Sequence, residues 1–470
     1  SNVSIVSNAD ITIDADTIDY GAVELVAGLA ADMIQTGTAT RDLTLRNSGD
    51  ITITSNESPN SFTNQIAGIW AGYSGLEGLT PAPPRGIRLG TGVIENIGSI
   101  TVERGAGIMT SDLDYGTLDV LNSGTITASG PNGDVFAYGI NIEAGAASNF
   151  GGKRYQTTTV RNTGTITVED RGATAIGISL EKNVGPRFDN RDSSPGTVVN
   201  DGRIIQANIE GLDFGTGIRI EQGVSLTTGN GAVANMPGST LTATNNGTID
   251  VSSYGISVQS NANRVVTNTG TINITTLRNF GIGVLYDFSS PSGSDPTPYN
   301  PVGNRTTFTN SATGIIRVTS TGAAANDEDS PSGVVIYGGD PVISNAGLIS
   351  ATGRAAVGLS HIASFQIFGS SGIPAIAGTV NATNSGTIEA SGANAQGLVV
   401  SRLYNSAGDA RNTTLTNSGT ISATGDGAVG IVHSVAPRAD RNGLPTVDPT
   451  IANLGTATLA LSSTSVVRGG

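Results

Sequence analysis

One short phrase recurs along the whole chain, and it constrains the fold more than any other feature. It reads NTGTITV at residues 162–168 and returns, slightly varied, as NSGTITA, NTGTINI, NSGTIEA and NSGTISA. Aligned on the Asn of N-x-G-x-I, clear copies start at Asn47, Asn96, Asn122, Asn162, Asn200, Asn245, Asn268, Asn345, Asn384 and Asn417. Degenerate copies start at Asn8, Asn310 and Asn453, and the spacings run from 23 to 49 residues. A period in this range is typical of solenoids and propellers.

Each copy of the phrase has the same internal pattern. In the copy at Asn162, an apolar Val160 precedes the Asn by two positions, and Ile166 and Val168 follow it. This alternation of apolar and polar residues is broken only at x-G, which predicts a strand, a tight turn and a second strand. We expect the Gly to supply a positive φ at this turn and the Asn side chain to cap it through hydrogen bonds.

A second phrase supplies a third strand for each repeat. It reads YGINIE from residue 138, IGISLE from 176 and TGIRIE from 216. The shortest repeat, from Asn245 to Asn268, holds all three strands in 23 residues. A four-stranded propeller blade needs about 40 residues. We therefore predict an all-β, right-handed parallel β-helix (β-solenoid) of roughly 13 coils, with three short strands per coil, as a single domain over residues 1–470.

The longer repeats insert loops at one preferred corner, between the G-I strand and the strand that leads to the Asn. An example is KNVGPRFDNRDSSPG over residues 182–196, which is rich in Gly, Pro, Asp and Ser. Insertions at one corner of a solenoid predict a decorated face that often binds partners. Because coils stack at strand spacing, the ten clear asparagines predict an internal amide ladder. A buried Asn without such a partner would cost free energy.

Composition excludes several classes of protein. The net charge is −14 with only two lysines, Lys153 and Lys182, which opposes binding to nucleic acid. There is no cysteine, which excludes disulfides and Cys-based metal sites and fits a chain that crosses a membrane pore unfolded. The sequence contains no apolar run of 18 residues, so it predicts no membrane-spanning helix. The chain begins SNVSIVSNAD without Met, so we expect a processed or trimmed form.

The repeated N-S-G-T-I coils and G-I-x-V strands resemble the passenger regions of Gram-negative autotransporters and related large surface β-helix proteins. The resemblance covers nearly the whole chain. It implies export to the bacterial cell surface, an extracellular location outside the outer membrane, and a C-terminal translocator barrel that has been cleaved or trimmed from this sequence. Members of this family include adhesins, proteases and surface-layer proteins, so the resemblance implies no single activity.

Few residues predict chemistry. His361 and His433 are expected to be ordinary histidines, and the absence of G-x-S-x-G disfavours a serine protease. Two acidic clusters contain Asp112 and Asp114, and Asp327 and Asp329. They could serve as acid and base on a polysaccharide, or as Ca²⁺ ligands. Solvated loop charge is the favoured interpretation, because no basic residue repeats beside them. We expect no cofactor, with Ca²⁺ as the one candidate ion.

Several aromatic residues lie in or beside the expected loops. The candidates for a binding face are Trp70, Tyr73, Tyr286 and Tyr299. Aromatic side chains on such a face can stack on sugars or anchor a protein partner. The alternative is that the loops pack on their own apolar residues.

The sequence favours a non-enzymatic extracellular structural or adhesive surface protein. A β-helix stalk would associate with copies of itself, laterally or end to end, because open solenoid ends present unpaired strand edges and neither terminus shows a polar helical cap. The loop face would bind a surface glycan or a host-cell protein. The alternative is a carbohydrate-binding or carbohydrate-active β-helix that resembles polysaccharide lyases and hydrolases.

Overall fold

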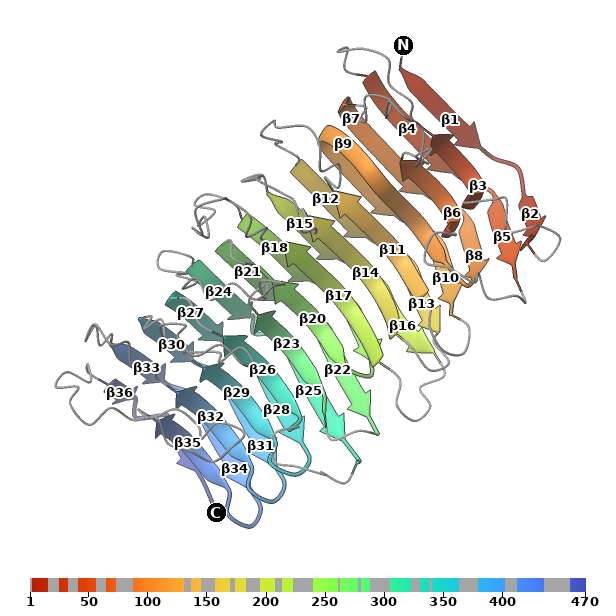
Figure 1. The fold of residues 1–470 in the computed structure, drawn as a ribbon. Helices are drawn as coiled ribbons and strands as arrows, with labels where there is room; N and C mark the ends of the chain where they lie inside the picture. Colours follow the sequence, from red (N-terminus) through yellow and green to blue (C-terminus); the bar gives the residue numbers. More distant parts are fainter. Residues whose placement is uncertain are drawn as a thin grey trace, which may run out of the picture. The chain divides into compact units, whose positions relative to one another are not determined.

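A computed structural model shows a right-handed parallel β-helix with three strands in each coil, as the repeat predicts (Figure 1). It describes residues 2–15, 25–32, 41–55, 65–72, 88–130, 137–144, 157–169, 174–182, 195–207, 214–222, 240–260, 263–277, 280–287, 305–322, 330–337, 340–362, 379–401, 412–434 and 457–470. No helix in these ranges is long and apolar enough to cross a membrane.

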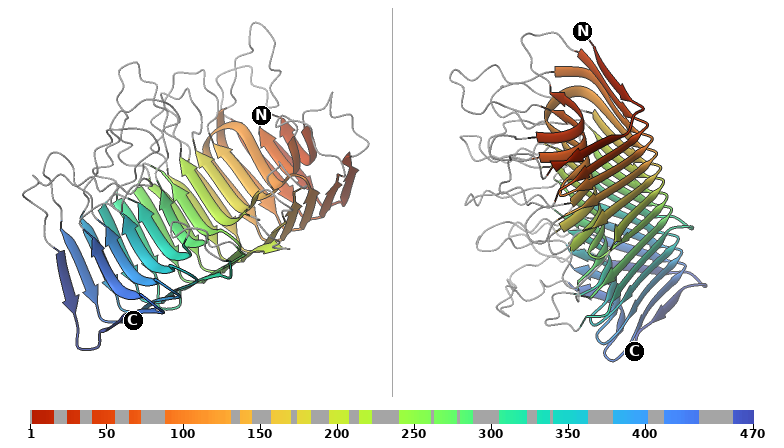
Figure 2. Two further views of the ribbon diagram at one scale, coloured as in Figure 1. Left: turned by 60° about the horizontal axis from the view of Figure 1, so that its bottom comes forward. Right: turned by 90° about the vertical axis from the view of Figure 1, so that its right-hand side faces the viewer.

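The chain divides into two compact units. Unit 1 comprises Ser1–Thr227 with Asn246–Ser252, and unit 2 comprises Thr228–Asn245 with Ser253–Gly470. In each unit the strands form three parallel sheets, here called A, B and C, and the chain visits them in the order A, B, C (Figure 2). The sequence-based expectation of one domain stays a prediction.

Unit 1 holds the first coils. Its sheet A contains β1 (Val3–Ser7), β4 (Arg41–Asn47), β7 (Arg88–Asn96), the end of β9 (Ala106–Asn122), β12 (Thr157–Asn162) and β15 (Gly196–Asn200). Sheet B contains β2 (Ile11–Asp14), β5 (Asp50–Thr54), β8 (Ser99–Glu103), β10 (Thr125–Ser129), β13 (Thr165–Glu169), β16 (Arg203–Ala207) and β19 (Thr248–Val251). Sheet C contains β3 (Leu25–Asp32), β6 (Gln65–Gly72), the start of β9, β11 (Ala137–Ala144), β14 (Thr174–Lys182) and β17 (Phe214–Gln222).

Unit 2 repeats the same arrangement. Its sheet A contains β18 (Thr240–Asn245), β21 (Asn263–Asn268), β24 (Arg305–Asn310), β27 (Asp340–Asn345), β30 (Val380–Asn384), β33 (Thr413–Asn417) and β36 (Ala457–Leu461). Sheet B contains β22 (Thr271–Thr276), β25 (Ile315–Ser320), β28 (Leu348–Thr352), β31 (Thr387–Ser391), β34 (Thr420–Thr424) and β37 (Val466–Arg468). Sheet C contains β20 (Tyr254–Gln259), β23 (Ile282–Asp287), β26 (Ser332–Tyr337), β29 (Val357–Ile362), β32 (Gln396–Ser401) and β35 (Val429–Ser434).

Neighbouring coils pair in strict register, so equivalent residues form columns. In sheet B, Ile126 pairs with Ile166 and Ile166 with Ile204, and all three are buried. Sheets A and C have similar apolar columns inside. Since side chains alternate across a strand, every second residue of each strand enters the interior. One coil's pattern therefore has to match the next, which is why the phrase recurs.

The corner between sheets A and B is the most uniform part of the coil. In most coils it consists of two residues, such as Thr163 and Gly164 between β12 and β13. The nitrogens of both residues donate to the carbonyl oxygen of Asn122 in the preceding coil, at 2.8 and 3.2 Å. Each corner thus lies directly on the corner before it.

The corner glycine is required by this close stacking. A Cβ at Gly164 would overlap the carbonyl oxygen of Gly124, and one at Gly202 would overlap that of Gly164. The predicted positive φ is wrong at this corner. Among the described glycines, positive φ occurs only at Gly353, Gly392, Gly425, Gly427 and Gly470. The missing Cβ makes room for the neighbouring backbone, which is a different use of glycine.

The glycine of the G-I phrase has a comparable role in sheet C. A Cβ at Gly139 would overlap Cγ2 of Ile166, which lies in sheet B of the next coil, and would lie 2.5 Å from the carbonyl oxygen of Gly177. The isoleucine column of sheet B therefore packs directly on a glycine column of sheet C. This contact links the two repeated phrases of the sequence physically.

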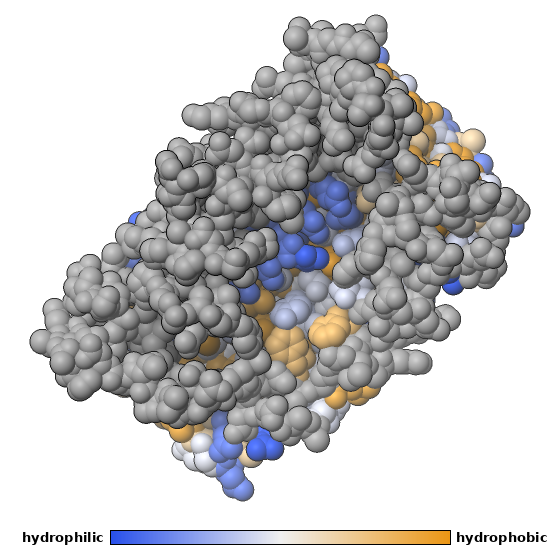
Figure 3. All heavy atoms as spheres, viewed as in Figure 1, coloured by the Kyte–Doolittle hydropathy of each residue, from blue (hydrophilic) through white to orange (hydrophobic). Residues whose placement is uncertain are grey.

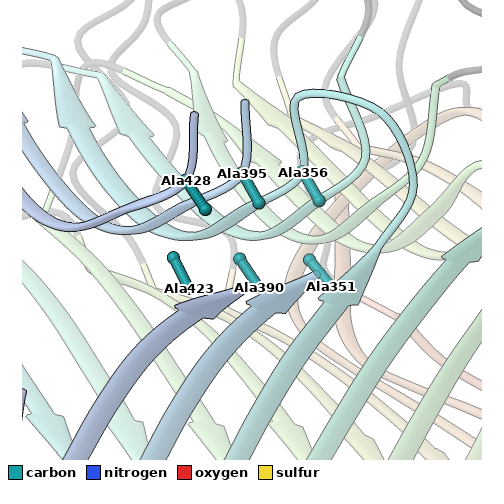
Figure 4. Packing of buried hydrophobic residues seen from close by; sticks show 6 residues of the cluster. All are labelled: Ala351, Ala356, Ala390, Ala395, Ala423 and Ala428. Atoms are coloured by element: carbon teal, nitrogen blue, oxygen red, sulfur yellow. The ribbon is translucent and has the colours of Figure 1, made fainter. Parts of the chain in front are cut away.

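Positive φ occurs instead at the corner between sheets B and C near the C-terminal end. Gly353, Gly392 and Gly425 have φ of 145°, 134° and 124°. These corners enclose a cluster of small residues in which three alanines from β28, β31 and β34 face three alanines that precede sheet C (Figure 4). The cluster consists of Ala351, Ala356, Ala390, Ala395, Ala423 and Ala428.

The two degenerate copies at the ends of the chain align differently from the sequence-based expectation. Ser7, and not Asn8, is in register with Asn47. Leu461 is in register with Asn417, whereas Asn453 lies outside the described residues. The strand register follows the apolar alternation, which places Val467 opposite Ile421 in sheet B.

The stacked corner predicts which substitutions of Gly164 the fold tolerates. Gly164→Ala and Gly164→Asn should each lower the free energy of unfolding by about 1–3 kcal/mol, because any Cβ overlaps the Gly124 carbonyl. Denaturant unfolding measures this. A positive φ would instead let Asn replace Gly with little loss.

The adjacent Thr163→Ala is the matched control, since Thr163 is exposed on the same corner. It should change stability by about 0.5 kcal/mol or less. A Gly164→Asn variant as stable as the parent protein would contradict the stacking account.

Candidate functional site

The predicted asparagines form hydrogen-bonded columns inside each unit. In unit 1, the Nδ2 atom of each ladder asparagine donates to Oδ1 of the next one at 2.8–2.9 Å. The residues, in order, are Asn47, Asn96, Asn122, Asn162 and Asn200. In unit 2, the same contact links Asn245, Asn268, Asn310, Asn345, Asn384 and Asn417 at 2.7–2.9 Å. All of these side chains are buried.

Each ladder amide also closes its own corner. Asn162 Nδ2 donates to the carbonyl of Gly164 at 3.2 Å and lies 3.3 Å from that of Arg203 in the next coil. The side chain therefore caps the turn, as expected, and joins two coils. A buried carboxamide satisfied in this way contributes to stability, whereas an unsatisfied one would oppose folding.

The ladder extends further than the clear repeats suggest and ends for a visible reason. Asn310, from a copy one residue too long, occupies a regular rung between Asn268 and Asn345. The corner after Asn310 accommodates the extra residue. There the Gly314 carbonyl accepts a bond from Asn310 Nδ2, just as the Gly164 carbonyl accepts one from Asn162 Nδ2. At the other end, Asn47 Oδ1 has no partner, because its register neighbour is Ser7.

The structure describes the backbone of only one of the two acidic clusters proposed for catalysis or calcium. Asp112 and Asp114 lie within β9, a single strand that runs from sheet C into sheet A, so the expectation that they lie on a loop is wrong. This coil has no insertion at that corner. Asp327 and Asp329 lie outside the described residues. Within the described ranges, no three His, Asp or Glu side chains are arranged to hold a metal ion.

Two of the four aromatic binding-face candidates are buried, which corrects that expectation. Trp70 is 1 % exposed and lies within β6. Tyr286 is 0 % exposed and donates its hydroxyl hydrogen to the Thr307 carbonyl at 2.7 Å. Apolar alternation places Tyr286 in an inward column, which the sequence-based argument from nearby loop residues overlooked. Tyr73 and Tyr299 lie outside the described residues.

Tyr286 belongs to a buried polar group in unit 2 that is structural. The Arg264 guanidinium lies 5.6 Å from the Tyr286 ring centroid and donates to the Asp287 carbonyl at 2.8 Å and to Thr306 Oγ1 at 2.7 Å. Burial holds the pKa of Tyr286 well above its usual range. These contacts satisfy a cation inside the solenoid and present no open surface.

The two histidines lie in one column of sheet C, two coils apart. His361 pairs with Val400, and Val400 pairs with His433. His361 is buried and His433 is exposed. Their separation prevents joint action on one small ligand.

A polar group on the outer face of sheet C in unit 1 is the arrangement that most resembles a site. Ile140 and Ile142 of β11 face the interior, so the residues between and after them face outward. Register places equivalent outward residues of β14 and β17 beside them. The sheet C polar group consists of Asn141, Glu143, Ser179, Glu181, Arg219 and Glu221. Figure 3 shows hydrophilic surface near the middle of the drawn face.

Charge pairing within this group is dense. Arg219 Nη2 lies 2.5 Å from Glu221 Oε2, and Nη1 lies 3.8 Å from Glu181 Oε1. Ser179 Oγ lies 3.4 Å from Glu181 Oε1. The side chains of Arg219, Glu181 and Glu221 keep 26 %, 18 % and 17 % of their surface exposed, so a ligand could reach them.

The environment alters how these groups titrate. Burial raises the pKa of Glu181, and the neighbouring Glu221 adds to this, while Arg219 opposes it. Burial alone would lower the pKa of Arg219, but the two carboxylates raise it. Burial, followed by the charge of Glu181, raises the pKa of the Tyr138 hydroxyl. Perturbed groups of this kind gather at functional sites more often than elsewhere.

Sequence reasoning missed this group because its members come from three separate repeats. The signal was present in the aligned phrases YGINIE, IGISLE and TGIRIE, whose last residues are Glu143, Glu181 and Glu221. Reading the repeats as columns would have placed three glutamates side by side.

No protein-family model, curated protein or solved structure matches the chain. The site must therefore be interpreted from its geometry.

Removing one rung tests the energetic role of the ladder. Asn162→Leu deprives Asn122 Nδ2 of its shorter hydrogen bond, leaving the one to the Gly124 carbonyl, and deprives Asn200 Oδ1 of the Asn162 donor. We expect the free energy of unfolding to fall by about 3 kcal/mol, because two buried groups lose partners. Asn8→Leu, at an exposed asparagine outside the ladder, is the matched control and should change stability by about 0.5 kcal/mol or less. Equal effects of the two variants would contradict the role assigned to the ladder.

The raised pKa of Glu181 predicts a pH-dependent stability. The folded state holds the Glu181 proton more tightly than the unfolded state, whose Glu pKa is about 4.3. The contribution of this group is fully present below that value and is lost as pH rises through the folded pKa. Between pH 4 and 7, the parent protein should therefore lose stability relative to Glu181→Gln.

Asp201 supplies a control of opposite sign. The hydrogen bond from Asn246, opposed by burial and helped by Arg161, lowers the pKa of Asp201. Its contribution is present above about pH 3.9 and is lost as pH falls. Relative to Asp201→Asn, the parent protein should gain stability as pH rises. Urea unfolding from about pH 2 to pH 7 covers both transitions and measures both differences, and parallel pH profiles would contradict the assignment.

Proposed function

We propose that the chain is a non-enzymatic structural or adhesive protein of the bacterial cell surface, in which the β-helix acts as a stalk. The observation that carries the proposal is the continuous coil-to-coil bonding within each unit. In-register strands, stacked corners and an amide ladder bind each coil to the next. A chain whose buried polar groups serve this stacking is suited to spanning distance and presenting repeated surfaces.

The resemblance to autotransporter passengers supports an extracellular location. It rests on the N-S-G-T-I coils and the G-I-x-V strands, and the described structure has the parallel β-solenoid fold that such passengers share. The acidic, lysine-poor composition and the lack of cysteine agree with export through a pore. Ca²⁺ remains a candidate ion through Asp327 and Asp329.

Lateral self-association is supported by the outer face of sheet B in unit 1. Its central column carries one short hydroxyl side chain in each of the first five coils, Thr12, Thr52, Thr101, Thr127 and Thr167, and continues with Ile205 and Asp250. The residues repeat at strand spacing, about 4.8 Å. Contacts that are weak singly would therefore be repeated along two aligned stalks, which raises the overall affinity.

Self-association can be tested by sedimentation velocity and electron microscopy, with calcium and then with chelator. We expect concentration-dependent assembly into sheets or fibres. Thr101→Lys with Thr127→Lys should suppress it, because like charges would meet where two stalks pack. Thr242→Lys with Thr244→Lys, on sheet A of unit 2, is the matched control. Monomers at all concentrations in both solutions would rule out the self-association proposal.

Carbohydrate binding is the second candidate function. It is favoured by the sheet C polar group, in which partly exposed carboxylates and a guanidinium lie beside a buried hydroxyl and a buried amide. A stalk with such a site would attach to a surface glycan.

A further inference from the structure

One buried acceptor in the sheet C polar group lacks a partner in the folded chain. Asn141 is 3 % exposed, and its Oδ1 atom accepts no hydrogen bond. Leaving a buried amide oxygen unsatisfied opposes folding. The ladder asparagines of this chain do not show the problem except at Asn47, where the ladder begins. The orphaned oxygen therefore calls for an explanation specific to its position.

The register places the Asn141 side chain at the edge of the polar group, between Met109 on one side and Ser179 on the other. Asn141 lies between the inward-facing Ile140 and Ile142, so its side chain lies on the outer face. Its register neighbour is Ser179, and the next residue in that column is Arg219. Ser179 Oγ lies 3.4 Å from Glu181 Oε1, which shows that the two outward columns are in contact.

The mixture of donors and acceptors distinguishes between kinds of ligand. A divalent cation would meet the positive charge of Arg219, which already lies against Glu221 and Glu181. No three carboxylate or imidazole groups in the described part of the chain are arranged for a metal. A hydroxyl-rich ligand suits the face better, since each hydroxyl both donates and accepts. The guanidinium supplies donors, while the carboxylates and the amide oxygen supply acceptors.

We propose that the outer face of β11, β14 and β17 is a saccharide-binding site, in which a sugar hydroxyl donates to Asn141 Oδ1 and further hydroxyls bond to the Glu181, Arg219 and Glu221 side chains. Three carboxylates and one guanidinium make the site electronegative, so it favours neutral sugars or amino sugars over acidic ones. The Tyr138 hydroxyl lies within electrostatic reach of these groups and borders the site. The proposal deepens the attachment function by naming its ligand class.

The test uses the full chain on an array of neutral, amino and acidic oligosaccharides, followed by calorimetric titration of the tightest binder. We expect binding to neutral or amino members. Asn141→Leu should weaken it about ten-fold or more, the loss expected for one buried hydrogen bond. The same substitution should leave the free protein as stable as the parent or more stable, because it removes an unsatisfied group. If Asn141 had only a structural role, Asn141→Leu would not weaken binding while leaving the stability of the free protein intact.

Two controls complete the test. Asn8→Leu repeats the substitution at an exposed asparagine of the same unit and should leave binding unchanged. Sedimentation of Asn141→Leu should match the parent protein, so a failure of the site is distinguishable from a failure of stalk assembly. Binding to no array member, binding unaffected by Asn141→Leu, or binding of Ca²⁺ alone would overturn the proposal.

Discussion

The stacking of one A–B corner on the next is the constraint on which the rest of the structure depends. At this corner, the carbonyl oxygen of Asn122 accepts bonds from Thr163 and Gly164, while its side chain donates to Asn162. The backbones lie so close that a Cβ on the corner glycine has no room. Once this contact is made in each coil, the strands on either side are held in register, and their inward residues must align in columns.

The same constraint explains where the chain varies. The A–B corner keeps two residues in nearly every coil, because each extra residue would have to fit between two stacked backbones. The single enlarged corner within the ladder, at Asn310, recovers the pattern by giving Gly314 the role of the usual glycine. The other two corners lack the ladder, and sequence differences between coils gather there. Function is accordingly expected on sheet faces and at those corners, as in the sheet C polar group.

Most of the fold could be predicted from the sequence, because apolar periodicity and a short repeat leave few alternatives. The asparagine ladder followed from the need to satisfy a buried amide. Asn310 was missed as a regular rung only because its copy of the phrase contains one extra residue. The predicted positive φ was wrong, since local turn preferences cannot show that a neighbouring coil lies against the glycine. Tyr286 was misplaced for a related reason, because nearness to loop residues does not reveal the facing of a strand residue. Trp70 differs, because its column runs through Met109 to the outward-facing Asn141, yet its side chain is buried. The sheet C polar group unites residues from three repeats, so it emerges only when the repeats are placed in register.

The account is tested most directly by a double-mutant cycle across one rung of the ladder. Asn122 and Asn162 are replaced by alanine singly and together, and the free energies of unfolding are compared with those of the pair Asn96 and Asn200, which share no direct bond among the contacts described. The ladder predicts a coupling energy of about 1 kcal/mol or more for the adjacent pair and near-additive effects for the separated pair. Additive effects in both pairs would contradict the claim that the corners act on one another through the amide ladder.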